Sequence, residues 1–335
     1  LWIYLTRDQR KGNSMANAKY GNCVDYSGIA GNDAAKRALQ IAAAGGHGIL
    51  LIGPSGSEKE ALARLLPTIL PELDEGEARE TALVYEQAGK DLPEGASRTR
   101  PLREIDPPTS LAKLVGGGCP VVPGEASLAH NGVLMLAGLP EFTATQLMAL
   151  RSAIAEGEIT IVRARGVATF PSRFMLAATA EPCPCGRSGT PELGKCACPE
   201  AKVRRYLDDI AGSLSDAIDL FAGVSRMSPG IRAAEGPSTT SESMRDGVIA
   251  AREFRRWRAE RCSDPFVNIN SPRILESCPE RIVDMVLCAQ QPRFDCMDAR
   301  PLMRVLSVAR TLADMSQKEQ IGEDDVLEAM LYTRM

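Results

Sequence analysis

The sequence is poor in aromatic residues and in long apolar runs, and each shortage argues against a class of protein. Aromatic residues make up 4% of the 335 residues, and only two residues are histidines. Few aromatics disfavour a large all-β fold and a base-stacking platform for nucleic acid. No apolar run is long enough for a transmembrane helix, so we expect no membrane partner. The net charge of −4 means that any nucleic-acid role needs a local basic face.

The ten cysteines do not have the setting of an extracellular disulfide framework. No signal peptide is recognisable, because the apolar start of five residues is followed at once by Arg7, Arg10 and Lys11. We therefore expect a reducing, cytoplasmic location. The chain begins at Leu1 rather than Met, which predicts a fragment or a processed product, and residues 1–24 are expected to form a tail or linker.

Hydrophobic patterning predicts an α/β domain at residues 25–225. Four short apolar runs with helical material between them are typical of a buried parallel sheet, at residues 48–52, 132–136, 174–178 and 218–224. Residues 159–170 alternate between apolar and polar side chains, which predicts a β-hairpin.

A second, smaller domain is expected to be helical. Residues 226–243 are rich in Pro, Gly, Ser and Thr, which predicts a linker, and residues 244–335 have helical apolar spacing. Within it, residues 252–261 carry five arginines around Trp257 with glutamates between them. We interpret that segment as an exposed helix face.

The loop after the first apolar run has the order strand, glycine loop with lysine, and helix that defines a phosphate-binding P-loop. Its nucleotide-binding candidates are Gly53, Pro54, Ser55, Gly56, Ser57 and Lys59. Against the pattern Gly-x-x-x-x-Gly-Lys-Ser/Thr, Glu58 replaces the second glycine and Glu60 replaces the hydroxyl that holds magnesium. Both changes add negative charge beside the phosphates, so we expect ATP and magnesium to bind weakly or not at all. The alternative is a solvated charged turn with no ligand.

Many further segments follow one another in an order that identifies a family. They include residues 42–47, 114–118, 128–133, 139–142, 157–161, 170–174, 182–186, 203–207 and 308–314. Together they resemble the magnesium-chelatase-like AAA+ ATPases of the ComM/YifB type, over residues 25–333. The resemblance implies an AAA+ P-loop domain with a parallel sheet and a C-terminal helical lid. It also implies hexameric rings that bind DNA and couple ATP hydrolysis to branch migration.

The residues that carry ATP hydrolysis in that family are changed in this sequence. The resemblance places an Asp-Glu pair at the end of one strand, where this chain has Ala137 and Gly138. It places a water-orienting Asn where Glu181 stands, and a trans-acting arginine where Ala217 stands. We therefore assign no catalytic residues and expect a pseudoenzyme.

Two lid arginines keep the family pattern. Arg300 and Arg304 are four residues apart, so they share one helix face, and Asp298 is a suitable N-cap. The resemblance implies that Arg300 reaches the nucleotide phosphates. A solvated helix face, with Asp298 and Asp314 nearby, is the alternative.

Four cysteines are crowded into sixteen residues and predict a metal site. They are Cys183, Cys185, Cys196 and Cys198. The loop between the two pairs is rich in glycine and can fold back, and four thiolates suit tetrahedral, structural zinc. Four reduced thiols on a surface loop are the alternative. His47 and His130 are each isolated, so we expect core or turn roles for them.

Arg163 and Arg165 alternate with apolar residues on the predicted hairpin and therefore point to one face. In a ring of this family the corresponding hairpin faces the pore, which makes both arginines candidates for binding DNA phosphates. The alternative is a solvated hairpin edge protected by charge.

These observations favour a non-hydrolysing AAA+ subunit that forms a homo- or hetero-oligomeric ring and is associated with DNA processing. One alternative is an active ATP-dependent DNA branch-migration helicase with an unusual site. Another is a zinc-stabilised protein-interaction module. ATPase activity with and without DNA separates the first two, and the absence of a ring marks the third.

Overall fold

The computed structural model describes most of the chain between residues 25 and 333. The described residues are 25–92, 98–164, 166–188, 195–226, 239–261, 278–290 and 300–333. The expected tail at 1–24, Arg165, Asp298 and most of the expected linker lie outside them.

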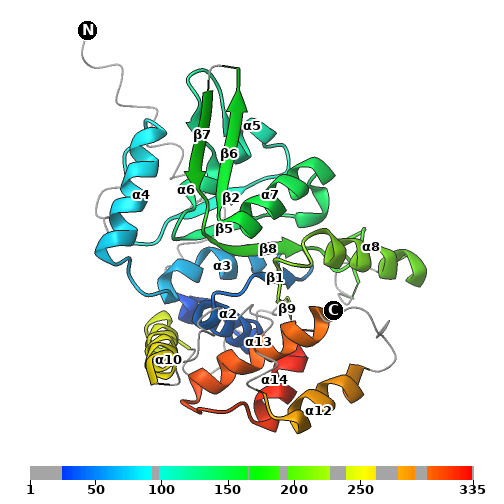
Figure 1. The fold of residues 1–335 in the computed structure, drawn as a ribbon. Coiled ribbons are helices and arrows are strands. Elements are labelled where there is room, and N and C mark those ends of the chain that lie inside the picture. The colour runs from blue at the N-terminus through cyan, green and yellow to red at the C-terminus, as the bar shows by residue number, and fades with distance from the viewer. Residues whose placement is uncertain are drawn as a thin grey trace.

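A five-stranded parallel sheet forms the centre of the molecule (Figure 1). Its strands are β1 (Ile49–Ile52), β2 (Leu102–Ile105), β5 (Val133–Leu136), β8 (Met175–Ala180) and β9 (Leu220–Gly223). Their order is β2-β5-β8-β1-β9, and every neighbouring pair is parallel. Nearly all of the side chains of β1, β5 and β8 are buried, as a sheet covered on both faces requires. The predicted α/β class is therefore confirmed.

Helices and short turns connect the strands. Before β5 these are η1 (Tyr26–Gly28), α2 (Asp33–Gly45), α3 (Lys59–Arg64), η2 (Leu66–Ile69), α4 (Glu75–Gln87), α5 (Leu111–Val115) and α6 (Glu125–Leu128). After β5 they are η3 (Leu139–Glu141), α7 (Ala144–Glu156) and α8 (Glu200–Ser213). Two small antiparallel pairs lie outside the main sheet, β3 (Gly116–Gly117) with β4 (Val122–Pro123), and β6 (Glu158–Arg163) with β7 (Gly166–Pro171). The β6–β7 pair confirms the predicted hairpin, which projects from the sheet on the side away from the C-terminal helices (Figure 1).

The C-terminal part is helical, as the sequence predicts. It consists of α10 (Ser241–Arg261), α12 (Glu280–Gln290), α13 (Arg300–Met315) and α14 (Glu323–Tyr332). These helices pack beneath α2 (Figure 1), and one hydrophobic cluster includes Leu39 of α2, Ile49 of β1, Val248 of α10 and Leu306 of α13. No helix among the described residues is long and apolar enough to cross a membrane.

Buried polar contacts join the helical part to the sheet. His47 lies just before β1, and its Nδ1 and Nε2 are each 2.8 Å from a partner, Asp219 Oδ2 and Thr311 Oγ1. His130 is also fully buried. Both histidines therefore have the core roles that we expected.

The expectation that residues 252–261 form an exposed face was wrong in part. Arg258 is 6% exposed and donates to both carboxylate oxygens of Asp314, at 3.1 and 3.2 Å. Arg252 is half-buried against the C-terminal end of α2. Charge spacing alone did not reveal these partners, because both come from helices distant in sequence.

Candidate functional site

The predicted phosphate loop follows β1 at the carboxyl edge of the sheet. The N–H of Gly53 donates to the carbonyl of Ala180 at 3.1 Å, which ties the loop to the end of β8. A Cβ at Gly53 would lie 2.3 Å from the carbonyl oxygen of Val224, so only glycine fits there. Ser55 and Gly56 are exposed at the tip of the loop, and Gly56 has a φ of 78°.

The backbone at Glu58 has the conformation that glycine usually provides. Glu58 precedes α3 with φ 66° and ψ 18°, in the left-handed region. A residue with a Cβ loses roughly 1–2 kcal/mol there. Glu58 therefore takes a left-handed backbone conformation at the position where the P-loop pattern has its second glycine.

Lys59 is buried and surrounded by acceptors from its own chain. Its side chain is 3% exposed, and its Nζ lies 3.0 Å from Glu181 Oε1 and 3.3 Å from Glu60 Oε1. The carbonyl oxygen of Pro54 also accepts from Nζ, at 3.4 Å. Hydrogen bonds run from Nζ to Glu181 and Pro54, and Glu60 adds a second negative charge at ion-pair distance. A phosphate group at Nζ would therefore have to compete with two carboxylates that already pair with it.

Glu181 follows β8 directly, which brings its carboxylate over the loop. Its Oε2 and the Ser57 hydroxyl are buried and have no hydrogen-bond partner among the residues that the structure describes. The Tyr206 hydroxyl donates to the Glu181 carbonyl at 3.2 Å. Burial, followed by the charge of Glu181, raises the pKa of Tyr206 to about 12. The sequence showed that Glu181 was unusual but not that Lys59 was its partner, because 122 residues separate them.

The end of β5 lies between β2 and β8 at the same edge of the sheet. Ala137 and Gly138 follow the strand there, and the N–H of Gly138 donates to Thr179 Oγ1 at 3.2 Å. A methyl group and a hydrogen therefore occupy the two positions from which a strand-end carboxylate pair would reach the loop.

Arg300 and Arg304 contact the opposite edge of the sheet. Because Leu220 pairs with Ile49, the residues before β9 lie at the amino edge, away from the phosphate loop. There Arg300 Nη1 lies 3.3 Å from Asp216 Oδ1, and Arg304 Nη2 donates to the Ser215 carbonyl at 2.6 Å. Ala217 is in the same segment. These contacts do not bring either arginine together with the loop of its own chain.

The four cysteines come together as predicted. Their sulfur atoms all lie within 4.8 Å of one another. The Sγ of Cys183 is 3.4 Å from that of Cys185 and 3.7 Å from that of Cys196. A tetrahedron with Zn–S bonds of ~2.3 Å has sulfur atoms ~3.8 Å apart, so the donor set fits a metal ion of this size. A hydrogen bond from the backbone of Arg187, followed by one from Cys183, lowers the pKa of the Cys185 thiol to about 6, whereas a hydrogen bond with Cys185 raises the pKa of the Cys198 thiol.

The hairpin carries one described DNA candidate. Arg163 is the last residue of β6 and is exposed. Val162 and Val167 beside it are 68% and 66% exposed, so the end of the hairpin presents apolar as well as basic side chains.

The strand order, the loop after β1 and the helical C-terminal part define an α/β P-loop domain with a lid, consistent with the AAA+ class. Residues 25–231 match the family model "Magnesium chelatase, subunit ChlI", and residues 238–333 match that of its C-terminal region. The chain therefore belongs to the magnesium chelatase ChlI family, as a protein of the ComM/YifB type.

Three relatives support this assignment. The chain is 36% identical to the uncharacterised protein YifB of Escherichia coli over 309 residues, which covers 92% of this chain and 60% of YifB. It is 36% identical to the competence protein ComM of Haemophilus influenzae over 324 residues, 96% of this chain and 62% of ComM. It is 33% identical to an uncharacterised protein of Mycobacterium tuberculosis over 315 residues, 93% of this chain and 62% of the relative. The chain thus spans about three fifths of the length of these relatives.

Proposed function

We propose that this chain is a non-hydrolysing, ring-forming member of its family that acts as a scaffold in DNA processing. The observation that carries the proposal is the arrangement at Lys59, whose ammonium group forms ion pairs with two carboxylates of its own chain and donates to one of them and to a backbone carbonyl. These groups lie where a bound nucleotide would need the lysine. The loop therefore suits a subunit that holds its shape without a nucleotide.

The residues around the loop support the same proposal. Hydrolysis needs a carboxylate to hold magnesium and another to activate water. Ala137 and Gly138 offer neither at the end of β5, and Glu60 replaces the magnesium-binding hydroxyl. The residues present therefore do not fit magnesium-ATP. At the amino edge Ala217 offers no cation to a neighbouring subunit, and an arginine finger contributes several orders of magnitude in rate.

The test is steady-state ATPase activity of the purified chain with magnesium, with and without DNA. We expect no phosphate release above that of a Lys59→Ala variant, because hydrolysis has no residues to carry it. A DNA-stimulated rate on the order of 1 s⁻¹, typical of slow enzymes, that disappears in Lys59→Ala would refute the proposal.

We also propose that the four cysteines hold one structural zinc ion. The spacing of the sulfur atoms supports a tetrahedral site, and four protein ligands leave no open position for catalysis. Bound zinc would fix the segment after Glu181 against α8. Thiolate ligands of this kind suit the reducing cytoplasm that we propose as the location.

A DNA-facing role is proposed for the hairpin. Support comes from Arg163 at the end of β6, on an element that projects from the sheet (Figure 1). Arg163→Ala should weaken DNA binding and reduce the slope of log K against log salt by about 1, as the loss of one phosphate contact predicts. Arg204→Ala, on α8, is the matched control, since Arg204 is exposed and lies on another element. Equal effects of both variants would contradict this role.

A further inference from the structure

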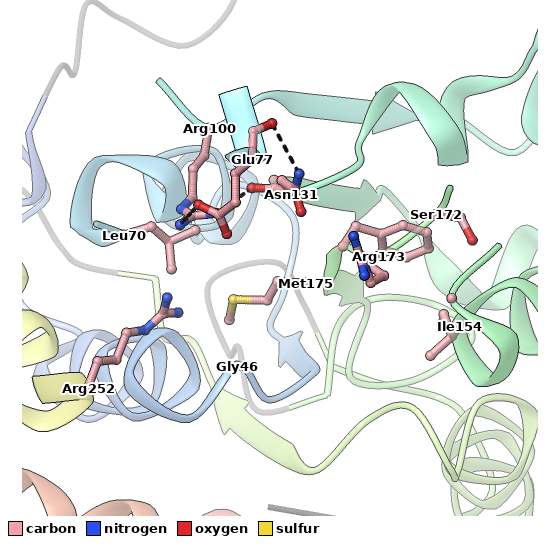
Figure 2. Close-up of a pocket in the computed structure, with 13 residues that line it drawn as sticks. Gly46, Leu70, Glu77, Arg100, Asn131, Ile154, Ser172, Arg173, Met175 and Arg252 are labelled. Carbon is pink, nitrogen blue, oxygen red and sulfur yellow. Dashed lines mark hydrogen bonds and ion pairs between the residues drawn. The ribbon is translucent and has the colours of Figure 1, made fainter. Parts of the chain in front are cut away.

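A cavity of about 350 Å³ lies at the amino edge of the sheet, opposite the phosphate loop (Figure 2). Residues that precede four strands line it: Gly46 before β1, Arg100 before β2, Gly132 before β5 and Arg173 before β8. Arg252 reaches it from α10. The lining thus comes from both the sheet domain and the helical part.

The charges of the lining are unequal, with three arginines against one glutamate. Arg100 pairs with that glutamate, Glu77, at 2.8 Å. Arg173 is 63% exposed and pairs with Glu80 at 2.8 Å. These two guanidinium groups therefore have carboxylate partners.

Arg252 differs from the other two arginines. Its Nε and Nη2 both donate to the Ala43 carbonyl at the end of α2, at 3.1 and 2.6 Å. No carboxylate within the described ranges forms an ion pair with it. Burial, followed by the charges of Arg100 and Arg255, lowers the pKa of Arg252 to about 10, so it stays protonated at pH 7. The Glu77 carboxylate in the same lining offsets part of the cost of burying this charge, and an anion bound in the cavity would stabilise the half-buried cation further.

The remaining wall of the cavity is apolar. Leu70, Ile154, Phe174 and Met175 contribute to it, and Figure 2 shows the Met175 side chain between Arg252 and Arg173. Small-molecule sites typically have this size and combine apolar walls with a few charged groups. Guanidinium groups bind phosphate and carboxylate through paired N–H donors.

We propose that this cavity binds a small organic anion, with a phosphate or carboxylate group at Arg252 and an apolar body against Met175. The site is separate from the phosphate loop and does not depend on whether the chain hydrolyses ATP. Because the cavity is lined by α10 and by the residues that precede β5 and β8, a bound anion would also hold α10 against the amino ends of these strands.

The test uses phenyl phosphate and benzoate as probes, titrated calorimetrically into the full chain at low ionic strength. Benzyl alcohol is the neutral probe. We expect saturable binding of at least one anion and none of the alcohol. Arg252→Gln should weaken binding at least tenfold, whereas Arg252→Lys keeps the charge and should retain part of it. Arg256→Gln, an exposed arginine of the same helix, is the matched control and should change affinity less than twofold.

Binding must also persist in Lys59→Ala, which alters only the phosphate loop. Binding that is lost in Lys59→Ala, or that Arg252→Gln leaves intact, would overturn the proposal. So would the absence of binding of both anions to the wild-type chain. A preference for phenyl phosphate or for benzoate identifies which anionic group the site accepts. Far-ultraviolet circular dichroism of each variant establishes that it is folded.

Discussion

Restoring the consensus loop should restore ATP binding, and the affinity should rise with each carboxylate that is removed from the phosphate loop and its surroundings. The first variant combines Glu58→Gly with Glu60→Thr, and the second adds Glu181→Asn. A carboxylate ~4 Å from a phosphate charge repels it by roughly 4 kcal/mol at an effective dielectric constant of ~20. Glu60 and Glu181 are partly exposed, at 22% and 38%, so solvent reduces this effect. Even ~1.4 kcal/mol for each removed carboxylate corresponds to a tenfold gain in affinity.

We therefore expect the double variant to bind ATP with magnesium about 100-fold more tightly than the wild type, and the triple variant at least tenfold more tightly again. The fold should tolerate the changes. Glycine at position 58 relieves roughly 1–2 kcal/mol of left-handed backbone strain and costs about 0.5–1 kcal/mol in chain entropy. Isothermal titration measures affinity, and thermal unfolding measures the stability of each variant. Hydrolysis should stay absent, because Ala137 and Gly138 are unchanged.

Glu86→Gln is the control for removal of negative charge, since Glu86 is exposed on α4, a helix outside the loop. It should leave ATP affinity unchanged. Tight ATP binding by the wild-type chain would show that the carboxylates at Lys59 do not compete with phosphate. A triple variant that is folded but gains no affinity would show that the loop backbone, and not its charge, prevents binding.

Three further predictions concern the metal site and the stability of the fold. One zinc ion per chain should remain after dialysis, and Cys196→Ser should lose both the metal and thermal stability; a metal-free chain with the same melting temperature would contradict this. Burial lowers the pKa of His130, and a hydrogen bond with His130 lowers the pKa of Glu80. The free energy of unfolding should therefore fall as the pH drops below about 6.5, and it should fall less steeply in His130→Gln. Urea titrations at several pH values measure this dependence. Asp314→Ala should destabilise the fold by about 3 kcal/mol in urea, because Arg258 loses its carboxylate partner; a change below about 1 kcal/mol would contradict this reading of the pair.

The sequence predicted the elements that have a strong local pattern. The apolar runs at β1, β5, β8 and β9 were found within two residues, because a doubly covered parallel sheet needs continuous apolar side chains. The edge strand β2 was missed. Its sequence includes Arg103 and Glu104, and charged side chains at a sheet edge do not look like a strand.

The candidate site was predictable in its parts but not in its contacts. The phosphate loop and the four cysteines have fixed local spacing, so their sequence alone indicated them. The partner of Lys59 could not be found in this way, because Glu181 approaches it only when β1 and β8 pair. Arg252 was equally hidden, since an arginine-rich helix usually faces solvent and its burial depends on the end of α2. Long-range packing decides such contacts, and a single sequence contains no local signal for them.

The hydrophobic cluster shared by the sheet and the C-terminal helices has a consequence for how this chain can move. Leu39, Val248 and Leu306 come from segments far apart in the sequence, yet they belong to one hydrophobic cluster. A swing of the C-terminal helices away from α2 would expose that interior to water, at roughly 25 cal/mol for every Å² of apolar surface. We therefore expect calorimetry to show one melting transition with equal van't Hoff and calorimetric enthalpies. In an assembly such a subunit would transmit force as a rigid block, and flexibility would be confined to the contacts between subunits.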